Sequence, residues 1–306
     1  MKKHASRLYS TGLVALLVAL AMLGGAAAGG AGTVYDYGMT DYDDYTPGDT
    51  TGEGLLGNFP NIEPTQVVDE ENINLTLLSI DYSSYEYVMI NYEVESTYEI
   101  PVTVQMWEFS INGYMINASC SSDVAPGEKK EDVVYIQQVD LDLAGIKEIA
   151  DMQLQFTVFD SASYDDILIT DYIQVSTGST YMQTYDDSGI VLYDKDEVKI
   201  VMKPLDYSDS LTGPRIPLYI ENNSDVALTF STSDLLINGK LIDDFFIVSV
   251  SPGKRLVAYI EYFETPKRQY GIEEFENIEF NMYVSSIRSF EVFFSTGNLY
   301  VELDEK

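Results

Sequence analysis

Histidine and cysteine are almost absent from the 306-residue sequence. The single histidine is His4, and the single cysteine is Cys120. Ser-His-Asp and Cys-His catalysis need a histidine, as do histidine-based metal sites, so none of these is available beyond the first few residues. One cysteine cannot form an internal disulfide, so the inter-sheet bridge of antibody domains is excluded as well.

Basic residues are also scarce. The chain carries 17 Lys and Arg against 50 Asp and Glu, a formal net charge of -33. Such a charge repels nucleic-acid phosphates and anionic lipid surfaces, so we expect no nucleic-acid partner. It favours cations, basic proteins or neutral glycans. A solvated extracellular surface accounts for the acidity, and adaptation to high salt is the alternative.

The N-terminus has the pattern of a secretory signal peptide over residues 1–28. A basic segment, Met1–Arg7, precedes an apolar run, Leu13–Leu23, and Ala26–Ala28 fits a small-residue cleavage site. We therefore expect a secreted or cell-envelope-associated protein that does not insert in the membrane after cleavage. The alternative is an uncleaved N-terminal anchor, because the run from Leu13 to Ala28 is only just short of a membrane span.

Residues 29–66 are dominated by Gly, Asp, Tyr and Thr. This segment shows neither a helical nor a strand apolar period, so it cannot bury a core. The composition predicts a disordered acidic spacer.

A short block of turn signals occurs twice in the rest of the chain. Asn112-Gly113 is followed by Pro126-Gly127, and the same pairs return 126 residues later as Asn238-Gly239 and Pro252-Gly253. A fixed spacing between matching turns is the signature of an internal repeat. We therefore expect one small β domain in two tandem copies.

The segments between these turns are typical of strands. In the first copy, Met152, Leu154, Phe156 and Val158 alternate with polar residues, which predicts a half-buried strand. The same pattern returns at Ile278, Phe280, Met282 and Val284. Other expected strands in the first copy are 73–80, 86–95, 102–109, 115–120, 133–137 and 167–175, with one helical turn over 145–149.

These elements predict an all-β protein with two tandem immunoglobulin-like β-sandwich domains. Short strands, regular Gly and Pro turns and almost no helical signal are typical of that fold. We place domain 1 at 67–177, a linker at 178–195 and domain 2 at 196–306. The linker is rich in Ser, Thr, Gly and Asp.

Three features of these copies resemble a known family. They are the turn Glu221-Asn222-Asn223-Ser224, the turn Pro252-Gly253-Lys254 and the late helical turn. They resemble the secreted Ig-like domains of Gram-positive bacteria that are akin to the immunoprotective extracellular proteins. The resemblance implies the fold and an extracellular setting for both copies. It offers no catalytic residues to carry over.

Two single residues are candidates for a role. Cys120 corresponds to Phe246 in the second copy, so we expect it to be a small buried apolar residue rather than a reactive thiol. Trp107 corresponds to Ser233 and is out of phase with Val104. It is our ligand-binding candidate, since an exposed Trp can stack on a sugar or peptide. The alternative is packing against the linker or the neighbouring domain.

Carboxylates are the remaining candidate groups. Asp186, Asp187, Asp194 and Asp196 crowd the linker, where oxygen ligands could hold calcium, the one cofactor considered. Glycoside hydrolysis needs two carboxylates facing each other across a cleft, and nothing in the sequence singles out such a pair. We therefore assign no catalytic residue and expect no enzyme.

The sequence thus predicts a non-catalytic binding or adhesion module. Its partner would be a protein or glycan of the cell surface or environment. The rival interpretation is a structural or accessory envelope protein that holds partner proteins, and an enzyme with carboxylate chemistry is a third.

Overall fold

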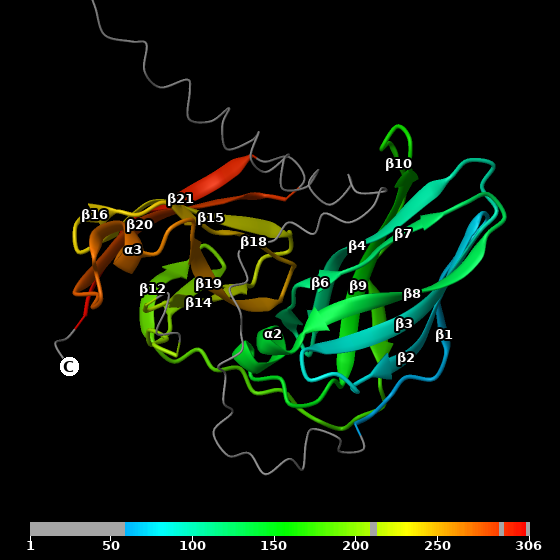
Figure 1. Cartoon of the computed structure of the whole chain (residues 1–306), viewed down its shortest axis with the longest axis horizontal. Coiled ribbons are helices and arrows are strands. Elements are labelled where there is room, and N and C mark those ends of the chain that lie inside the picture. The colour runs from blue at the N-terminus through cyan, green and yellow to red at the C-terminus, as the bar shows by residue number, and fades with distance from the viewer. Residues whose placement is uncertain (1–58, 209–212, 288–290, 304–306) are drawn as a thin grey trace, which may run out of the picture. The chain divides into compact units, whose positions relative to one another are not determined.

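A computed structural model describes residues 59–208, 213–287 and 291–303 of the chain (Figure 1). The predicted signal peptide and the predicted spacer as far as residue 58 lie outside the described residues. In the described part, no helix is long and apolar enough to cross a membrane.

The described part is almost entirely β, as the sequence predicts, and falls into two copies of one arrangement. We call residues 65–176 the first copy and residues 190–302 the second copy. The first copy contains β1 (Thr65–Glu70), β2 (Ile73–Asp81), β3 (Tyr87–Ser96), β4 (Val102–Ile111), β5 (Tyr114–Met115), β6 (Ala118–Ser119), β7 (Ser121–Val124), β8 (Lys129–Gln137), α2 (Gln138–Leu143), β9 (Asp151–Asp160), β10 (Asp166–Ile169) and β11 (Ile173–Ser176).

The second copy repeats this order, except that one long strand, β21, takes the place of β10 and β11. It contains β12 (Ile190–Lys195), β13 (Val198–Met202), β14 (Ile216–Asn222), β15 (Leu228–Ile237), β16 (Lys240–Leu241), β17 (Asp244–Phe245), β18 (Ile247–Val250), β19 (Arg255–Tyr262), α3 (Pro266–Tyr270), β20 (Asn277–Ser286) and β21 (Val292–Glu302). The bounds of β4, β5, β6, β7 and β9 recur at β15, β16, β17, β18 and β20 with the spacing of 126 residues that separates the two Asn-Gly turns.

Each copy encloses its own hydrophobic core between two layers of strands. In the first copy, the sheet β1-β2-β3-β8-β6 faces the strands β10-β9-β4-β5. In the second, β12, β13, β14 and β19 face the sheet β16-β15-β20-β21. The four apolar side chains of the alternating segment of β20 are fully buried at 0% exposure, as the period-2 pattern predicts.

The equivalent strand β9 differs from the prediction on its second face. Its apolar residues are buried, but so are Gln155 and Thr157, which the alternation predicts to be solvated. The backbone carbonyl of Thr170 accepts the Gln155 side-chain amide at 2.7 Å. The connection between β10 and β11 therefore contacts the outer face of β9, and only one side of β9 behaves as the sequence predicts.

Three expected boundaries shift. The helical turn expected over 145–149 lies earlier, at α2, and Gly145, two residues after the last residue of the helix, takes a left-handed φ of 65° that closes it. Gly271 ends α3 in the same way, with a φ of 70° in the left-handed region that glycine tolerates. Residues 190–195, expected in the linker, form β12 and pair with β13.

The predicted spacer also ends earlier than expected, since residues 59–66 are ordered. Asn61 holds this segment on β2, because its Oδ1 accepts the Ile80 N–H at 2.6 Å and its Nδ2 donates to the Ile80 carbonyl at 2.9 Å. Ile62 is buried at 6% exposure. Two hydrogen bonds and one buried apolar side chain explain why this segment packs on the first copy.

The asparagine of each repeated Asn-Gly turn has a second task. Asn112 Oδ1 accepts the N–H groups of Ala150 and Asp151 at 2.9 and 3.1 Å, and its Nδ2 donates to the Glu148 carbonyl at 2.6 Å. Asn238 makes the equivalent three bonds to Glu276, Asn277 and Glu274. In both copies, the asparagine thus ties its hairpin to the start of the long strand β9 or β20 and satisfies groups that would otherwise be unpaired.

Candidate functional site

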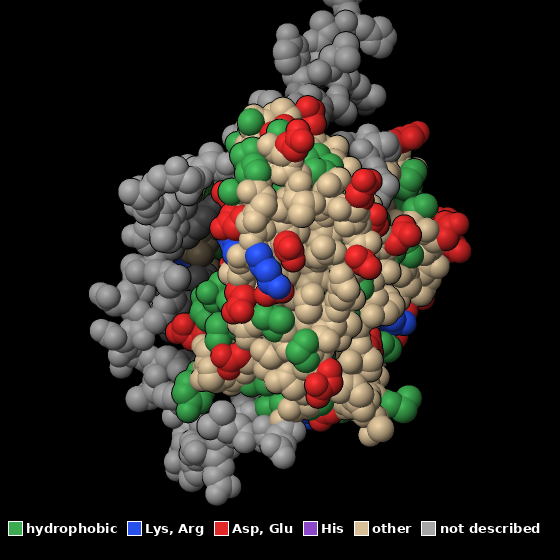
Figure 2. Space-filling view, turned by 90° about the vertical axis from the view of Figure 1, so that its right-hand side faces the viewer, with side chains coloured by type: hydrophobic (Ala, Val, Ile, Leu, Met, Phe, Trp, Pro, Cys, Tyr) green, Lys and Arg blue, Asp and Glu red, His purple; other side chains and the backbone are tan. Residues whose placement is uncertain are grey.

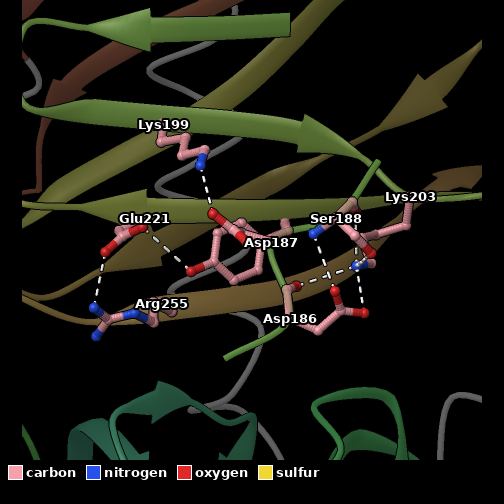
Figure 3. Close-up of polar contacts among 8 residues, drawn as sticks. Asp186, Asp187, Ser188, Lys199, Lys203, Glu221 and Arg255 are labelled. Carbon is pink, nitrogen blue, oxygen red and sulfur yellow. Dashed lines mark hydrogen bonds and ion pairs between the residues drawn. The ribbon is translucent and has the colours of Figure 1, made fainter. Parts of the chain in front are cut away.

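The linker between the copies lies over the outer face of β13, β14 and β19 (Figure 3). Asp186 Oδ2 pairs with Lys203 Nζ at 2.8 Å, and Asp187 Oδ2 pairs with Lys199 Nζ at 2.5 Å. The hydrogen bond and charge of Lys203 hold the pKa of Asp186 below its usual range, and those of Lys199 do the same for Asp187. These two calcium candidates are therefore neutralised by lysines.

The other two calcium candidates lie elsewhere, at the turn between β12 and β13. Asp196 Oδ2 accepts the Tyr193 hydroxyl at 2.5 Å, and Asp194 lies opposite Lys199 in the β12–β13 register. Among the residues that the structure describes, no three His, Cys, Asp or Glu side chains are grouped so that they could hold a metal ion. The structure thus gives Asp186, Asp187 and Asp196 ion-pair or hydrogen-bond partners, and it does not assemble the four aspartates as ligands.

A second set of contacts joins the two copies through Tyr185 and Arg255. The Arg255 guanidinium lies 4.0 Å from the centroid of the Tyr185 ring, and its Nη2 pairs with Glu221 Oε1 at 2.8 Å. The Arg255 N–H donates to the Gly113 carbonyl at 3.0 Å, where β19 meets β5 in a parallel bridge. The Tyr185 hydroxyl donates to the Asn112 carbonyl at 3.1 Å. The Asn-Gly hairpin of the first copy therefore docks on β19 of the second.

Burial and a carboxylate reinforce this junction. Glu108 accepts hydrogen bonds from the Ser251 hydroxyl and, at 2.9 Å, from the Tyr172 hydroxyl. Met115 packs in the core of the second copy, whereas Tyr219 packs in the core of the first. The two cores interlock in this way, so we assign the junction a structural role rather than a ligand site.

The structure places the two single-residue candidates differently. Cys120 is buried at 8% exposure, as predicted, and its thiol lies 3.0 Å from the Tyr92 hydroxyl. Burial raises the pKa of Cys120 to about 11, which keeps the thiol protonated at neutral pH. Trp107 lies in a β-bulge of β4 between Met106 and Glu108, with 43% of its surface exposed. Exposure is the one feature that keeps Trp107 a ligand-binding candidate.

A cavity of about 270 Å³ opens at the α2 end of the first copy. It forms where the segment at Phe59, the loop between β2 and β3, helix α2 and the loop leading to β9 meet. Its lining consists of Phe59, Tyr82, Ser83, Ser84, Tyr85, Val88, Gln138, Leu141, Asp142, Ile146, Lys147, Glu148 and Ile149. Trp107 is not part of it. An apolar hollow with a few polar groups is the usual form of a ligand site, and this one is slightly smaller than the usual range of roughly 300–1,000 Å³.

Aromatic rings form one wall of the cavity. The rings of Phe59 and Tyr82 lie 4.9 Å apart, and the Tyr82 hydroxyl donates to the Pro60 carbonyl at 3.1 Å. Burial, with a smaller contribution from the negative charge of Glu148, raises the pKa of Tyr82, so it remains a neutral phenol. Tyr85 is 82% exposed and lies at the mouth, where its ring is free to receive a ligand face.

Three polar side chains of the cavity, those of Gln138, Asp142 and Glu148, are held by hydrogen bonds. The Gln138 side-chain amide donates to Asp142 Oδ1 at 2.9 Å, and Glu148 accepts a hydrogen bond from the Ser179 hydroxyl. The backbone carbonyl of Glu148 is also held by Asn112. The sequence does not reveal this site, because Phe59 lies in the predicted spacer and the expected helical turn lies six to seven residues after α2. The sequence feature that indicates the site is the pair of apolar residues Leu141 and Ile146, one on each side of Gly145.

The second copy does not reproduce this lining. At the positions equivalent to Leu141 and Lys147 it has Lys267 and Glu273, whose Nζ and Oε1 atoms lie 3.5 Å apart as an ion pair. One apolar lining residue, Leu141, is thus replaced by a lysine, and the charge at the position of Lys147 is reversed. The cavity of the first copy is therefore not a general property of the repeated fold.

The comparisons with known proteins give no family. No protein-family model matches the sequence, and no curated protein matches it. Among solved structures, the YadV chaperone is 12% identical, with 70% of this chain and 92% of that chain covered and a TM-score of 0.24. The exo-chitosanase CsxA of Amycolatopsis orientalis is 12% identical, with 74% and 26% covered and a TM-score of 0.24.

Red sea bream transglutaminase gives a similar result. It is 11% identical, with 78% of this chain and 32% of that chain covered and a TM-score of 0.21. The chain thus spans a third or less of the transglutaminase and of the chitosanase. Likenesses with TM-scores this low carry no inference about the function of this chain.

Proposed function

We propose that this chain is a non-catalytic binding module of the extracellular or cell-envelope environment, built of two tandem Ig-like β-sandwiches. Its ligand, a glycan or protein of the cell surface or surroundings, enters the cavity at the α2 end of the first copy. The observation that carries the proposal is the aromatic, largely apolar lining of that cavity, with Tyr85 exposed at its mouth.

Charge narrows the class of ligand. The chain has a net charge of -33, and the cavity contains Asp142 and Glu148 against the single cation Lys147. Long-range repulsion disfavours anionic polymers, so the ligand is neutral or basic. Figure 2 shows one face of the molecule on which Asp and Glu side chains are scattered, with Lys and Arg at few places. An uncharged sugar ring stacked on Tyr85 fits this setting best.

The volume of the cavity limits how much of a ligand it can enclose. A volume of about 270 Å³ accommodates one end of a ligand rather than a whole oligomer. The rest of the ligand would lie on the surrounding surface, where contacts are exposed and weak. We therefore expect modest affinity from a single chain, as is usual for a site with few buried anchors.

The non-catalytic part of the proposal rests on the state of the carboxylates. Asp142 and Glu148 both accept hydrogen bonds from neighbouring side chains, Gln138 and Ser179. Glycoside hydrolysis needs one carboxylate as acid and another as base or nucleophile, each turned toward the substrate. Carboxylates engaged in holding the walls suit positioning better than proton transfer.

The test is a binding screen of the full chain against neutral and charged glycans, cell-wall polymers and matrix proteins, with calcium or with chelator. Tyr85→Ala removes the ring at the mouth, and Tyr270→Ala removes an exposed tyrosine from the equivalent helix of the second copy. We expect wild-type chain and Tyr270→Ala to bind a neutral glycan, and Tyr85→Ala to bind it about tenfold more weakly, or ~1.4 kcal/mol. Equal weakening by both variants would contradict the site.

A chain that binds nothing in the screen would contradict the module itself. The accessory envelope interpretation would then be favoured, and proteins that co-purify with the chain would be the next object of study. Binding that requires calcium would return attention to the linker aspartates.

A further inference from the structure

The ends of the three sheets differ in length and charge. The terminal strands among the described residues are β1 and β6, β10 and β12, and β16 and β21. Five of them are six residues or shorter, and β1, β10, β12 and β16 contain charged residues. Short strands and charges are the usual protection of sheet edges against pairing with another chain.

The sixth, β21, has neither protection. It is 11 residues long, and no residue from Val292 to Val301 is charged or a proline, although one residue in six of the chain is acidic. Val292, Phe293 and Tyr300 are about half exposed, at 52%, 49% and 55%. Within the described residues, β21 pairs only with β20, so its other side is open.

The equivalent edge of the first copy shows what protection looks like in this fold. There the same stretch is split into β10 and β11, with Asp166 at the start of β10 and Asp171 in the gap between the strands, where the second copy has Val292 and Gly297. In the second copy the stretch runs on through Thr296-Gly297 with no acidic residue. At matched positions the two edges thus differ in charge and in whether the strand is continuous.

The register shows which backbone groups of β21 are available. The Leu303 N–H donates to the Glu276 carbonyl at 2.8 Å, on the side of β20. In an antiparallel ladder the direction alternates from residue to residue, so Leu299 and Val301 also face β20. The N–H and C=O groups of Asn298, Tyr300 and Glu302 therefore point to the open side.

We propose that β21 pairs with β21 of a second copy of this chain, antiparallel and about a two-fold axis at Tyr300. Tyr300 then lies opposite Tyr300 of the other chain, and Asn298 lies opposite Glu302 in both halves. The three open residues of each strand form six backbone hydrogen bonds, two at the axis and two on either side. The two tyrosine rings lie side by side on the outer face, an arrangement that stabilises strand pairs.

Charge argues for a second copy as the occupant. Two chains of net charge -33 repel each other, so they can associate only where neither presents acidic residues. β21 offers such a neutral strip, and in this register its one acid, Glu302, meets an amide rather than another carboxylate. The contact is isologous, as expected for a two-fold dimer, so it closes and does not propagate into a fibre.

The β-bulges of β21 limit the pairing to its second half. The register with β20 shifts between Asn281 and Tyr283, opposite Thr296 and Gly297, and again at Phe293. Phe294 stacks on Tyr193 of β12, with ring centroids 5.5 Å apart, and helps to close the sandwich. The straight segment Asn298–Glu302 is therefore the part that is available for pairing.

The test is sedimentation equilibrium of the purified full chain with two matched proline variants. Tyr300→Pro removes an N–H that points to the open side and spares the ladder with β20. Gln174→Pro is its counterpart in the first copy, where Thr177 N–H donates to the Ala150 carbonyl at 3.0 Å in the same pattern. We expect wild type and Gln174→Pro to dimerise, and Tyr300→Pro to dimerise at least tenfold more weakly.

A second variant keeps the result interpretable if Tyr300→Pro fails to fold. Tyr300→Cys places two thiols across the axis, where paired Cα atoms lie about 5.5 Å apart, within the span of a disulfide. We expect Tyr300→Cys to cross-link into a dimer on mild oxidation and Gln174→Cys to remain uncross-linked. A monomeric wild type, or a dimer that all variants leave unchanged, would overturn the proposal.

Discussion

The same row of three strand positions is polar in one copy and apolar in the other. In the first copy, Thr76, Glu93 and Glu131 lie side by side across β2, β3 and β8. In the second copy, the equivalent row across β13, β14 and β19 is Val201, Tyr219 and Val257. The backbone pairing is identical, so the strand positions alone do not decide the residue type.

The covering of the row accounts for the difference. Val201 and Tyr219 are buried at 0% and 1% exposure, beneath the linker and the docked hairpin of the first copy, whereas Glu131 is exposed. Burial of apolar surface stabilises the junction, and a carboxylate there would lose its hydration without gaining a partner. The residues of the two copies therefore differ according to which face each copy buries.

The largest predicted effect comes from exchanging the central residues of these rows. Tyr219→Glu puts an unpaired charge beneath the linker, and we expect it to lower the free energy of unfolding by about 3–5 kcal/mol. Glu93→Tyr replaces a partly exposed residue that pairs with Lys129 at 2.7 Å, and we expect a change within about 1 kcal/mol. Urea unfolding measures both. Equal losses would show that the second copy's row is not specially buried.

The next effect compares the asparagines of the two Asn-Gly turns. Asn112 is buried at 3% exposure and Asn238 is half-buried, although their hydrogen bonds are equivalent. Asn112→Ala leaves buried backbone groups unpaired, so we expect a loss of about 1–3 kcal/mol. Water can replace the side chain at Asn238→Ala, which we expect to lose about half as much. Thermal unfolding of both variants decides, and a larger loss at Asn238 would contradict the comparison.

A smaller difference separates the glycines of the same turns. Gly113 and Gly239 both have positive φ, 85° and 70°, so alanine strains each by about 1 kcal/mol. A Cβ at Gly113 would also lie 2.5 Å from the Tyr185 hydroxyl, whereas one at Gly239 meets nothing within 4 Å. We expect Gly113→Ala to be the less stable variant by about 1 kcal/mol.

Hydrogen exchange of residues 177–189 shows whether this extra loss arises at the junction. Faster exchange there in Gly113→Ala, and not in Gly239→Ala, is the expected result. Identical exchange in the two variants would mean that Tyr185 moves aside without releasing the linker.

The smallest predicted effect is a pH dependence of the docking of the linker. The carboxylates of Asp186 and Asp187 have pKa values lowered by Lys203 and Lys199, so their ion pairs stabilise linker docking above the unfolded pKa, about 3.9. This contribution is lost as the pH falls from there through the lower folded pKa. We expect the protection of residues 177–189, measured relative to the intrinsic exchange rate at each pH, to fall below about pH 4. Lys199→Ala combined with Lys203→Ala should abolish this fall. Unchanged protection at low pH would contradict the role of these pairs.

The sequence predicts the repeat well because turns are local. The Asn-Gly pairs and the alternation at Ile278–Val284 fix strand positions without knowledge of the partner strand. The all-β class follows from the same local signals. The position of α2 does not follow from local signals, because a glycine can stand either before or after a helix. Gly145 closes the helix, and the sequence around it does not show on which side the helix lies.

The sequence does not predict which face of each sheet is covered by another part of the chain. Val201 and Tyr219 share one face of the sheet with Lys199 and Glu221. This mixture of apolar and charged residues does not by itself reveal that the linker lies over that face. The linker aspartates suggested calcium ligands, because their lysine partners belong to another segment. A comparison of the two copies, position by position, carries the missing signal: an apolar row where the other copy is polar marks the junction, and Leu141 against Lys267 marks the cavity.

The most direct test of the central claim, that the first copy carries the ligand site, is hydrogen exchange of the full chain with and without a glycan or protein that the screen identifies. Ligand should protect the segments around Tyr82–Val88, helix α2 and Ile146–Ile149, and leave α3 and its neighbours unchanged. Protection confined to the second copy or to the linker would contradict the account and place recognition outside the cavity.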